Sequence, residues 1–182
     1  MNWKTISSEY LFKDLWFTIR KDKCIKPDGS MVDPYYVYEF PDWVTAVAIT
    51  KEKQILLIRQ YRHAIGEVVI EIPGGCVDAS DKNLEEACAR ELMEETGYRF
   101  EKMEYLCKTS ANPSTNSNLM HIFLATGGEK IAEQKLDEAE DIEILLLSID
   151  QVKQLLRSNQ LLQSMHVTAL LYGLNRIGEL HY

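Results

Sequence analysis

The chain has 182 residues, of which 46% are hydrophobic and 26% are charged, and it carries a formal net charge of −8 at pH 7. These values are typical of a soluble globular protein with one well-formed core, and no apolar run approaches the roughly 20 residues that cross a bilayer. They argue against a membrane partner. The negative charge also argues against a nucleic-acid partner, because such proteins bind phosphates through basic patches.

The first residues and the cysteines indicate the compartment. The start, "MNWKTISSEYLFKDLWF", has no continuous apolar core after a basic patch, so it predicts no secretory signal. The four cysteines lie far apart and without CxxC spacing, which argues against a zinc knuckle and a disulfide framework. We therefore expect a reducing, cytoplasmic location.

The first 40 residues are expected to form strands. "LWFTIR" and "YYVYEF" are rich in apolar, aromatic and β-branched residues, and the turn sequence "KPDGS" lies between them. Pro41 then interrupts the pattern. We predict an N-terminal antiparallel β-hairpin segment, residues 1–42, followed by a main domain, residues 43–182.

The main domain is expected to interleave strands with helices. "VTAVAIT" (44–50) and "ILLIRQYR" (55–62) are predicted to pair across the turn "KEKQ", and "EVVIEIPGG" (67–75) is predicted to be a strand that ends at its Pro-Gly-Gly turn. Further strands are expected near 103–110, 119–125 and 142–148, and helices near 150–158 and 163–176. This order predicts an α/β domain with a mixed sheet.

The clearest helix follows Gly75. Asn83 is a good N-cap, Glu86 three positions later completes a capping-box pattern, and Gly97 supplies a C-terminal stop. Before the helix, the pair Gly74-Gly75 lets the backbone approach a ligand closely, because neither residue has a Cβ atom.

Within this helix, "RELMEETG" (90–97) gathers three glutamates in five residues. At about 100° per residue, Leu84, Cys88 and Leu92 mark the face that packs on the sheet, and Glu91 and Glu95 fall inside that face. Buried unpaired carboxylates are costly and repel one another, whereas a hard cation such as Mg²⁺ offsets both charges. The helix therefore predicts a metal site.

The stretch "GGCVDASDKNLEEACARELMEETGY" resembles the Nudix box, in which Gly, five residues, Glu, seven residues, Arg-Glu, an apolar residue, any residue, Glu-Glu, any residue and Gly follow in order. The matching positions are Gly75, Arg90, Glu91, Leu92, Glu94, Glu95, Gly97 and Tyr98. Asp81 replaces the first Glu, and the interval to Arg90 is one residue longer; alternatively, Lys82 holds that position. The capping or salt-bridging role of the first Glu is therefore not carried over.

The resemblance implies the Nudix fold, an α/β/α sandwich with a mixed sheet, preceded here by the N-terminal β-segment. It also implies two or three Mg²⁺ ions, with Mn²⁺ as the alternative. The implied metal ligands are Glu91, Glu94, Glu95 and the Gly74 carbonyl. The three glutamates are also the implied catalytic residues. Arg90 is expected to orient the carboxylates, and Gly75 and Gly97 are expected to be structural.

"RQYRHAIGEVVIEIPGG" and the aromatic N-terminal segment resemble ADP-ribose pyrophosphatases and their nucleotide-sugar relatives. This implies a homodimer that hydrolyses a nucleoside diphosphate derivative, foremost ADP-ribose to AMP and ribose 5-phosphate. Arg62 matches an arginine that contacts substrate phosphate, with a surface arginine that caps a strand end as the alternative.

The same resemblance makes Glu138 the candidate general base and Glu140 an auxiliary metal ligand, with a solvated acidic loop as the alternative. Trp16 and Tyr36 are candidates for stacking on the adenine, but packing in a core or dimer interface is more common for such rings. The four histidines form no metal-binding pattern and are expected to be structural or exposed. Two alternative functions stay open: hydrolysis of another nucleotide sugar such as GDP-mannose, and a domain that senses ADP-ribose without cleaving it.

Overall fold

Strands in this protein follow the apolar and β-branched runs of the sequence, because such side chains pack well on a pleated sheet. The computed structural model describes residues 1–14, 16–138 and 140–180. It divides into two compact units, one of Met1–Asp42 with Ser110–Leu119 and one of Trp43–Thr109 with Met120–Tyr182. The division into functional domains at residues 1–42 and 43–182 remains a prediction.

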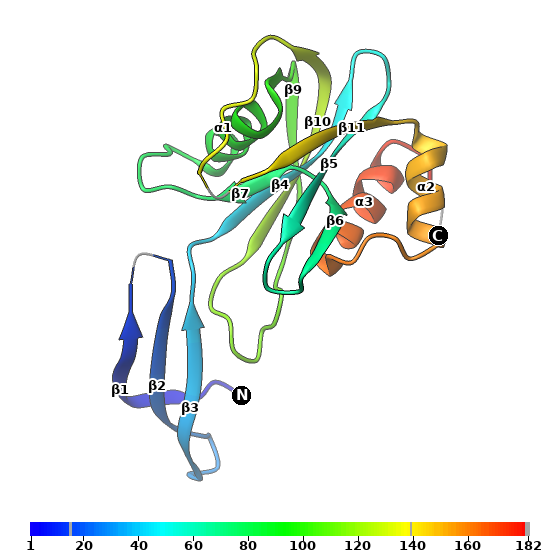
Figure 1. The fold of residues 1–182 in the computed structure, drawn as a ribbon. Helices are drawn as coiled ribbons and strands as arrows, with labels where there is room; N and C mark the ends of the chain where they lie inside the picture. The colour runs from blue at the N-terminus through cyan, green and yellow to red at the C-terminus, as the bar shows by residue number, and fades with distance from the viewer. Residues whose placement is uncertain (15, 139, 181–182) are drawn as a thin grey trace. The chain divides into compact units, whose positions relative to one another are not determined.

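The first unit is a three-stranded antiparallel sheet with strand order β1-β2-β3. Its strands, drawn in blue in Figure 1, are β1 (Lys4–Lys13), β2 (Thr18–Ile25) and β3 (Met31–Glu39). The prediction of a two-stranded hairpin was wrong in one respect, since β1 adds a third strand. All ten residues of β1 are exposed, so β1 lacks the buried face that produces a recognisable apolar alternation.

The second unit contains an eight-stranded sheet with strand order β11-β5-β4-β10-β8, and β6, β7 and β9 pair with β5, β4 and β10 respectively. β4 and β10 are parallel, and the other pairs are antiparallel, so the sheet is mixed as predicted. The strands are β4 (Trp43–Thr50), β5 (Ile55–Arg62), β6 (Glu67–Glu71), β7 (Gly74–Cys76), β8 (Tyr98–Arg99), β9 (Lys102–Thr109), β10 (Met120–Lys130) and β11 (Ile142–Leu147).

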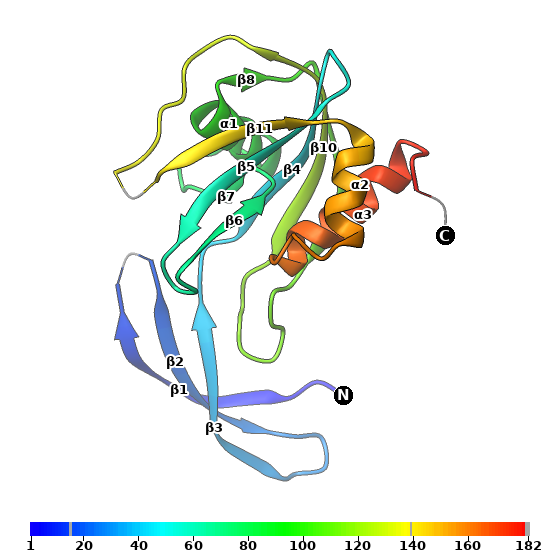
Figure 2. The same cartoon turned by 45° about the vertical axis from the view of Figure 1, so that its right-hand side comes forward.

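Helices cover both faces of this sheet, as Figures 1 and 2 show. α1 (Leu84–Thr96) packs on one face, where Ala87, Cys88 and Leu92 meet alternate residues of β4, β5 and β10. α2 (Ile149–Arg157) and α3 (Ser164–Arg176) pack on the other face, through a second apolar cluster. β4 is buried from Val44 to Thr50 because it lies between both helical layers. The predicted α/β/α sandwich is confirmed.

One prediction needs correction beside β4, and one short strand at the edge of the sheet was not predicted. The turn after β6 does not end the pairing there, because Gly74–Cys76 forms the short strand β7, which pairs antiparallel with Trp43–Thr45. A second short strand, β8, follows α1 directly and pairs with the end of β10. Both are too short to show a period in sequence. No helix in the described ranges of the chain is long and apolar enough to cross a membrane.

Candidate active site

The box helix α1 begins at the predicted cap. The Asn83 side chain accepts a hydrogen bond from the Glu86 N–H at 2.9 Å, which satisfies one of the free amides of the first turn. The expected reciprocal bond is shifted by one residue, because the Glu86 carboxylate accepts from the Lys82 N–H at 3.1 Å. The lengthened loop before the helix therefore ends at a well-capped first turn.

α1 ends at Gly97, which adopts the left-handed conformation with φ 72° and donates its N–H to the Met93 carbonyl at 2.8 Å. A Cβ atom at this position would lie 2.0 Å from the Ala132 carbonyl oxygen. Both the backbone angle and the close approach therefore require glycine here.

The glutamates of α1 differ in burial, as the helical period predicts. Glu95 is 3% exposed, the Glu91 side chain is 13% exposed, and the Glu94 side chain is 38% exposed. Burial raises the pKa of Glu91 to about 7 and the pKa of Glu95 to about 8. Negative neighbours add to both shifts, Glu94 to that of Glu91 and Glu91 to that of Glu95. Two carboxylates are thus held where ionisation is unfavourable without a counter-charge.

The glycine pair before α1 makes this placement possible. The Gly74 N–H donates to Glu95 Oε2 at 2.7 Å, which orients the buried carboxylate. A Cβ atom on Gly75 would lie 2.6 Å from the Glu91 carboxyl carbon, so a larger residue there would push Glu91 away. The predicted use of the Gly74 carbonyl as a metal ligand remains a prediction.

Arg90 joins the loop to the helix through its guanidinium group. It donates from Nη1 to Glu91 at 3.0 Å and to Glu94 at 2.9 Å, and from Nη2 to the Cys76 carbonyl at 2.9 Å. Its Nε and Nη2 atoms also form a fork on Asp81, at 3.1 and 3.0 Å. Asp81 therefore takes the salt-bridging position that the departure from the box pattern had left open, and its side chain is 4% exposed.

Arg62 lies at the end of β5 and bonds to a buried acid that sequence reasoning missed. Its Nε and Nη2 atoms lie 2.8 and 2.7 Å from Oε2 of Glu71 on β6. Gln60 donates to the same oxygen at 3.1 Å, and Nδ1 of His166 on α3 lies 4.0 Å from the other oxygen. The only sequence signal for this group was an acidic residue within the apolar run "EVVIEIP".

His166 is 6% exposed, and burial, aided by the charge of Arg62, lowers its pKa to about 3. Unfolded histidine takes up a proton below pH 6.5, whereas folded His166 stays neutral. The free energy of unfolding therefore falls as the pH drops from 6.5 toward 3. At pH 5 the loss is about 2 kcal/mol, because each pH unit below 6.5 costs about 1.36 kcal/mol. Denaturant unfolding at pH 7.5 and 5 should show this extra loss in the wild type and not in His166→Leu.

His63 is exposed and provides the matched control, so His63→Leu should keep the wild-type pH dependence. The opposite result is that the wild type gains stability relative to His166→Leu as the pH is lowered. That result would show that His166 is protonated and pairs with Glu71. Of the other histidines, His121 is buried and His181 lies outside the described residues.

The remaining predicted residues are scattered. The negative charge of Glu140 raises the pKa of both Glu91 and Glu95, after the larger effect of burial. Glu138 is exposed, and no interaction found within the described chain joins it to the box. Trp16 and Tyr36 belong to the first unit and are 67% and 46% exposed, so neither is a core residue. Their contact with adenine, and the roles of Glu138 and Glu140, remain predictions.

The box residues fit a divalent cation by donor type and burial, although their carboxylate oxygens do not point to a common position. Carboxylate oxygens are the ligands that Mg²⁺ prefers, and a cation would relieve the burial of Glu91 and Glu95. In residues 1–14, 16–138 and 140–180, no three His, Cys, Asp or Glu side chains are arranged to hold an ion. Arg90 and the Gly74 N–H instead hold the carboxylates, so metal binding would have to draw them together.

The comparisons with known proteins identify this arrangement. A sequence model of the NUDIX domain matches residues 40–165, which is more than half of the chain. The chain belongs to the NUDIX family. It is a Nudix hydrolase, and enzymes of this family generally use a divalent metal ion. A second model, of the nucleoside diphosphate sugar hydrolase N-terminal domain, matches residues 3–38.

Curated relatives match this Nudix hydrolase over nearly its whole length. A methanol dehydrogenase activator from Bacillus methanolicus is 30% identical, and an ADP-ribose pyrophosphatase from Bacillus subtilis (strain 168) is 26% identical; each match covers 93% of this chain and 91% of the relative. A GDP-mannose pyrophosphatase from Citrobacter koseri is 30% identical and covers 92% and 97%. The crystal structure of an ADP compounds hydrolase has a TM-score of 0.84 at 22% identity, covering 99% and 98%, which shows the shared fold.

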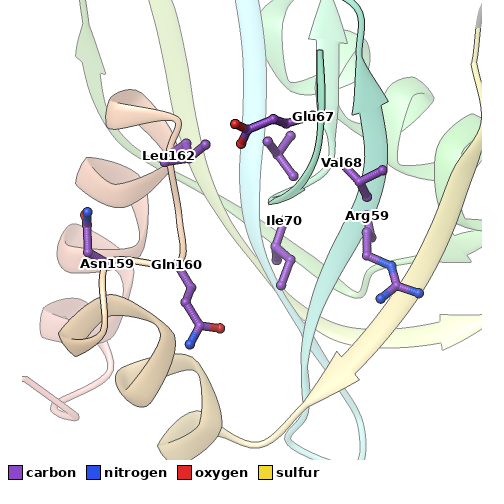
Figure 3. A pocket seen from close by; sticks show the side chains of 8 residues that line it. Arg59, Glu67, Val68, Ile70, Asn159, Gln160 and Leu162 are labelled. Atoms are coloured by element: carbon purple, nitrogen blue, oxygen red, sulfur yellow. The ribbon is translucent and has the colours of Figure 1, made fainter. Parts of the chain in front are cut away.

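A cavity of about 470 Å³ lies elsewhere on the Nudix domain, between the β5–β6 hairpin and the connection from α2 to α3. Figure 3 shows Arg59, Glu67 and Val68 on the strands and Asn159, Gln160 and Leu162 on the connection. No box residue lines it. This cavity is therefore separate from the box.

Proposed function

We propose that this Nudix hydrolase cleaves the pyrophosphate bond of ADP-ribose, giving AMP and ribose 5-phosphate. The observation that carries the proposal is the pair of carboxylates, Glu91 and Glu95, on the inner face of the box helix, where divalent cations would supply the missing counter-charge and would also bind the pyrophosphate. The similarity to an ADP-ribose pyrophosphatase over 93% of the chain supports the choice of substrate.

In the proposed mechanism, Glu91, Glu94 and Glu95 hold Mg²⁺, or Mn²⁺ in its place, with the Gly74 carbonyl and Glu140 as further ligands. When bound, the ions supply charge stabilisation at the phosphoryl oxygens and lower the pKa of a water molecule. The protein's part is to place the donors: Arg90 orients Glu91 and Glu94, and the Gly74 N–H orients Glu95.

Four further residues act on the substrate or on the attacking water in this proposal. Arg62 binds a phosphate oxygen with the donors that Glu71 leaves free, a task that suits a planar guanidinium. Glu138, or one of the box glutamates, accepts the proton of the attacking water. Trp16 and Tyr36 would stack on the base.

Hydrolysis of GDP-mannose is the second candidate, favoured by the match to a GDP-mannose pyrophosphatase at 30% identity. A phosphatase-coupled screen separates the two, because an intact diphosphate diester resists the phosphatase whereas both of its cleavage products are phosphate monoesters. With Mg²⁺ or Mn²⁺ present, we expect faster phosphate release from ADP-ribose than from GDP-mannose. Calorimetry that shows binding heat for ADP-ribose without turnover would contradict catalysis and indicate a sensor.

We also propose a cytoplasmic homodimer. All four cysteines are free thiols, which suits a reducing compartment. The first unit exposes a set of large apolar side chains on and beside β1, and such patches mark interaction surfaces; they are Trp3, Ile6, Tyr10, Leu11, Phe12 and Trp16. Light scattering should give twice the mass of the chain, and a monomer at micromolar concentration would contradict the dimer.

A further inference from the structure

We propose that Glu71 is a positioning residue that holds the Arg62 guanidinium in the orientation that receives the substrate phosphate. The inference rests on the proposed function, in which Arg62 binds phosphate. It adds Glu71, with Gln60 as its support, to the residues that determine substrate affinity.

The contact between Arg62 and Glu71 fixes one edge of the guanidinium and leaves the other edge available. Nε donates a hydrogen bond to Glu71 Oε2 at 2.8 Å, and Nη2 forms an ion pair with the same oxygen at 2.7 Å. Nη1 makes no hydrogen bond or ion pair within the described part of the chain, and the Arg62 side chain is 48% exposed. A phosphate oxygen can therefore bind Arg62 while Glu71 still holds it.

Glu71 is itself held rigidly. Its side chain is 5% exposed, and β6 is registered on β5 so that Glu71 is opposite Ile58. Gln60 lies on the same face of this strand pair and donates to Glu71 Oε2. Nδ1 of His166 lies 4.0 Å from the other carboxylate oxygen, Oε1. A buried acid with these neighbours is a fixed anchor, and a side chain bonded to it loses less freedom when substrate binds.

The anchor is also connected to the box. Glu71 is three residues before Gly74, whose N–H orients Glu95. Glu71, which holds Arg62, and the backbone N–H that orients a box carboxylate thus belong to one short stretch of chain, residues 71–74.

The chain contains a matched pair for comparison. Arg59, on the same strand as Arg62, donates its Nε to Glu143 on β11 at 2.9 Å. Both side chains are about half exposed, at 47% and 55%, so solvent screens the pair and no buried anchor holds it. Arg59 and Glu143 have no place in the proposed machinery, so Glu143→Gln controls for the loss of one carboxylate beside an arginine of β5.

The test is a double-mutant cycle with Glu71→Gln and Arg62→Ala, measured with the best substrate of the coupled screen. With Arg62 present, we expect Glu71→Gln to raise KM about tenfold while kcat stays within about twofold, since one ordered arginine is lost from binding. With Arg62→Ala present, Glu71→Gln should change KM by less than about twofold. Glu143→Gln should leave both parameters unchanged.

Equal changes in KM in both backgrounds would show a merely structural role for Glu71 and overturn the proposal, as would an unchanged or lower KM in the Arg62 background. Circular dichroism monitors folding. If Glu71→Gln does not fold, Gln60→Met replaces it in the same cycle, with about a threefold rise in KM expected only when Arg62 is present; no rise overturns the proposal.

Failure of the proposed function would be seen separately, as an absence of turnover on every nucleoside diphosphate derivative. The cycle is then measured as calorimetric binding of inorganic pyrophosphate with Mg²⁺. Weaker binding in Glu71→Gln only when Arg62 is present supports the positioning role, and equal binding in all four proteins overturns it.

Discussion

Replacing Glu95 by Gln should lower kcat by about a thousandfold with Mg²⁺ while the protein stays folded. A carboxylate that holds a catalytic cation contributes several kcal/mol to the transition state, and each 1.36 kcal/mol corresponds to about a factor of ten in rate. The amide oxygen of Gln can still accept the Gly74 N–H that now binds Glu95 Oε2. Because burial raises the pKa of Glu95 to about 8, an uncharged side chain is also better tolerated there without metal.

The measurement combines steady-state kinetics with thermal melting by circular dichroism. Glu85→Gln is the matched control, since Glu85 is exposed on the first turn of the same helix and should retain full activity. Wild-type enzyme treated with a chelator should fall to the residual rate of Glu95→Gln. Turnover by Glu95→Gln at the wild-type rate would contradict the assignment of Glu95 to the metal site.

Arg90→Ala should produce the largest loss of stability among the box residues. The substitution leaves the buried Asp81 carboxylate and the largely buried Glu91 carboxylate without their cation. Breaking a buried ion pair from one side costs roughly 3 kcal/mol, which corresponds to a fall in Tm of roughly 6–12 °C for a chain of this size. Melting in the absence of metal gives the value directly.

Two variants decide whether stranded charge is the cause. Arg99→Ala removes an exposed arginine just beyond the helix and should leave Tm within about 1–2 °C of the wild type. Adding Asp81→Asn to Arg90→Ala should recover part of the loss, because the stranded carboxylate is then neutral. A Tm for Arg90→Ala equal to that of Arg99→Ala would mean that the guanidinium is not needed to hold the loop.

Much of the helix-borne site could be predicted from the sequence. The cap at Asn83, the stop at Gly97 and the inward placement of Glu91 and Glu95 each depend on residues within a few turns of one another. Helical periodicity expresses such relations directly. The central strands were also predictable, since β4 is a continuous apolar run between two helical layers.

The partners of the two arginines were not predictable in the same way. Asp81 interrupts the expected spacing of the box, so its fork on Arg90 becomes visible only once the lengthened loop is folded back on the helix. Glu71 appeared in sequence as one acid in an apolar strand, and its bond to Arg62 depends on the register of β5 with β6.

By itself, then, the sequence determined the family, the α/β/α layers and the face of α1 that carries the acids, because apolar period and box spacing are local properties. The tertiary structure decided which donors hold those acids and which acid holds Arg62. The Gly74 N–H bonds to Glu95, which is 21 residues later in the sequence. His166 on α3 lies beside Glu71 on β6. Contacts of this kind arise from strand register and helix packing, which bring together side chains that no short-range pattern relates.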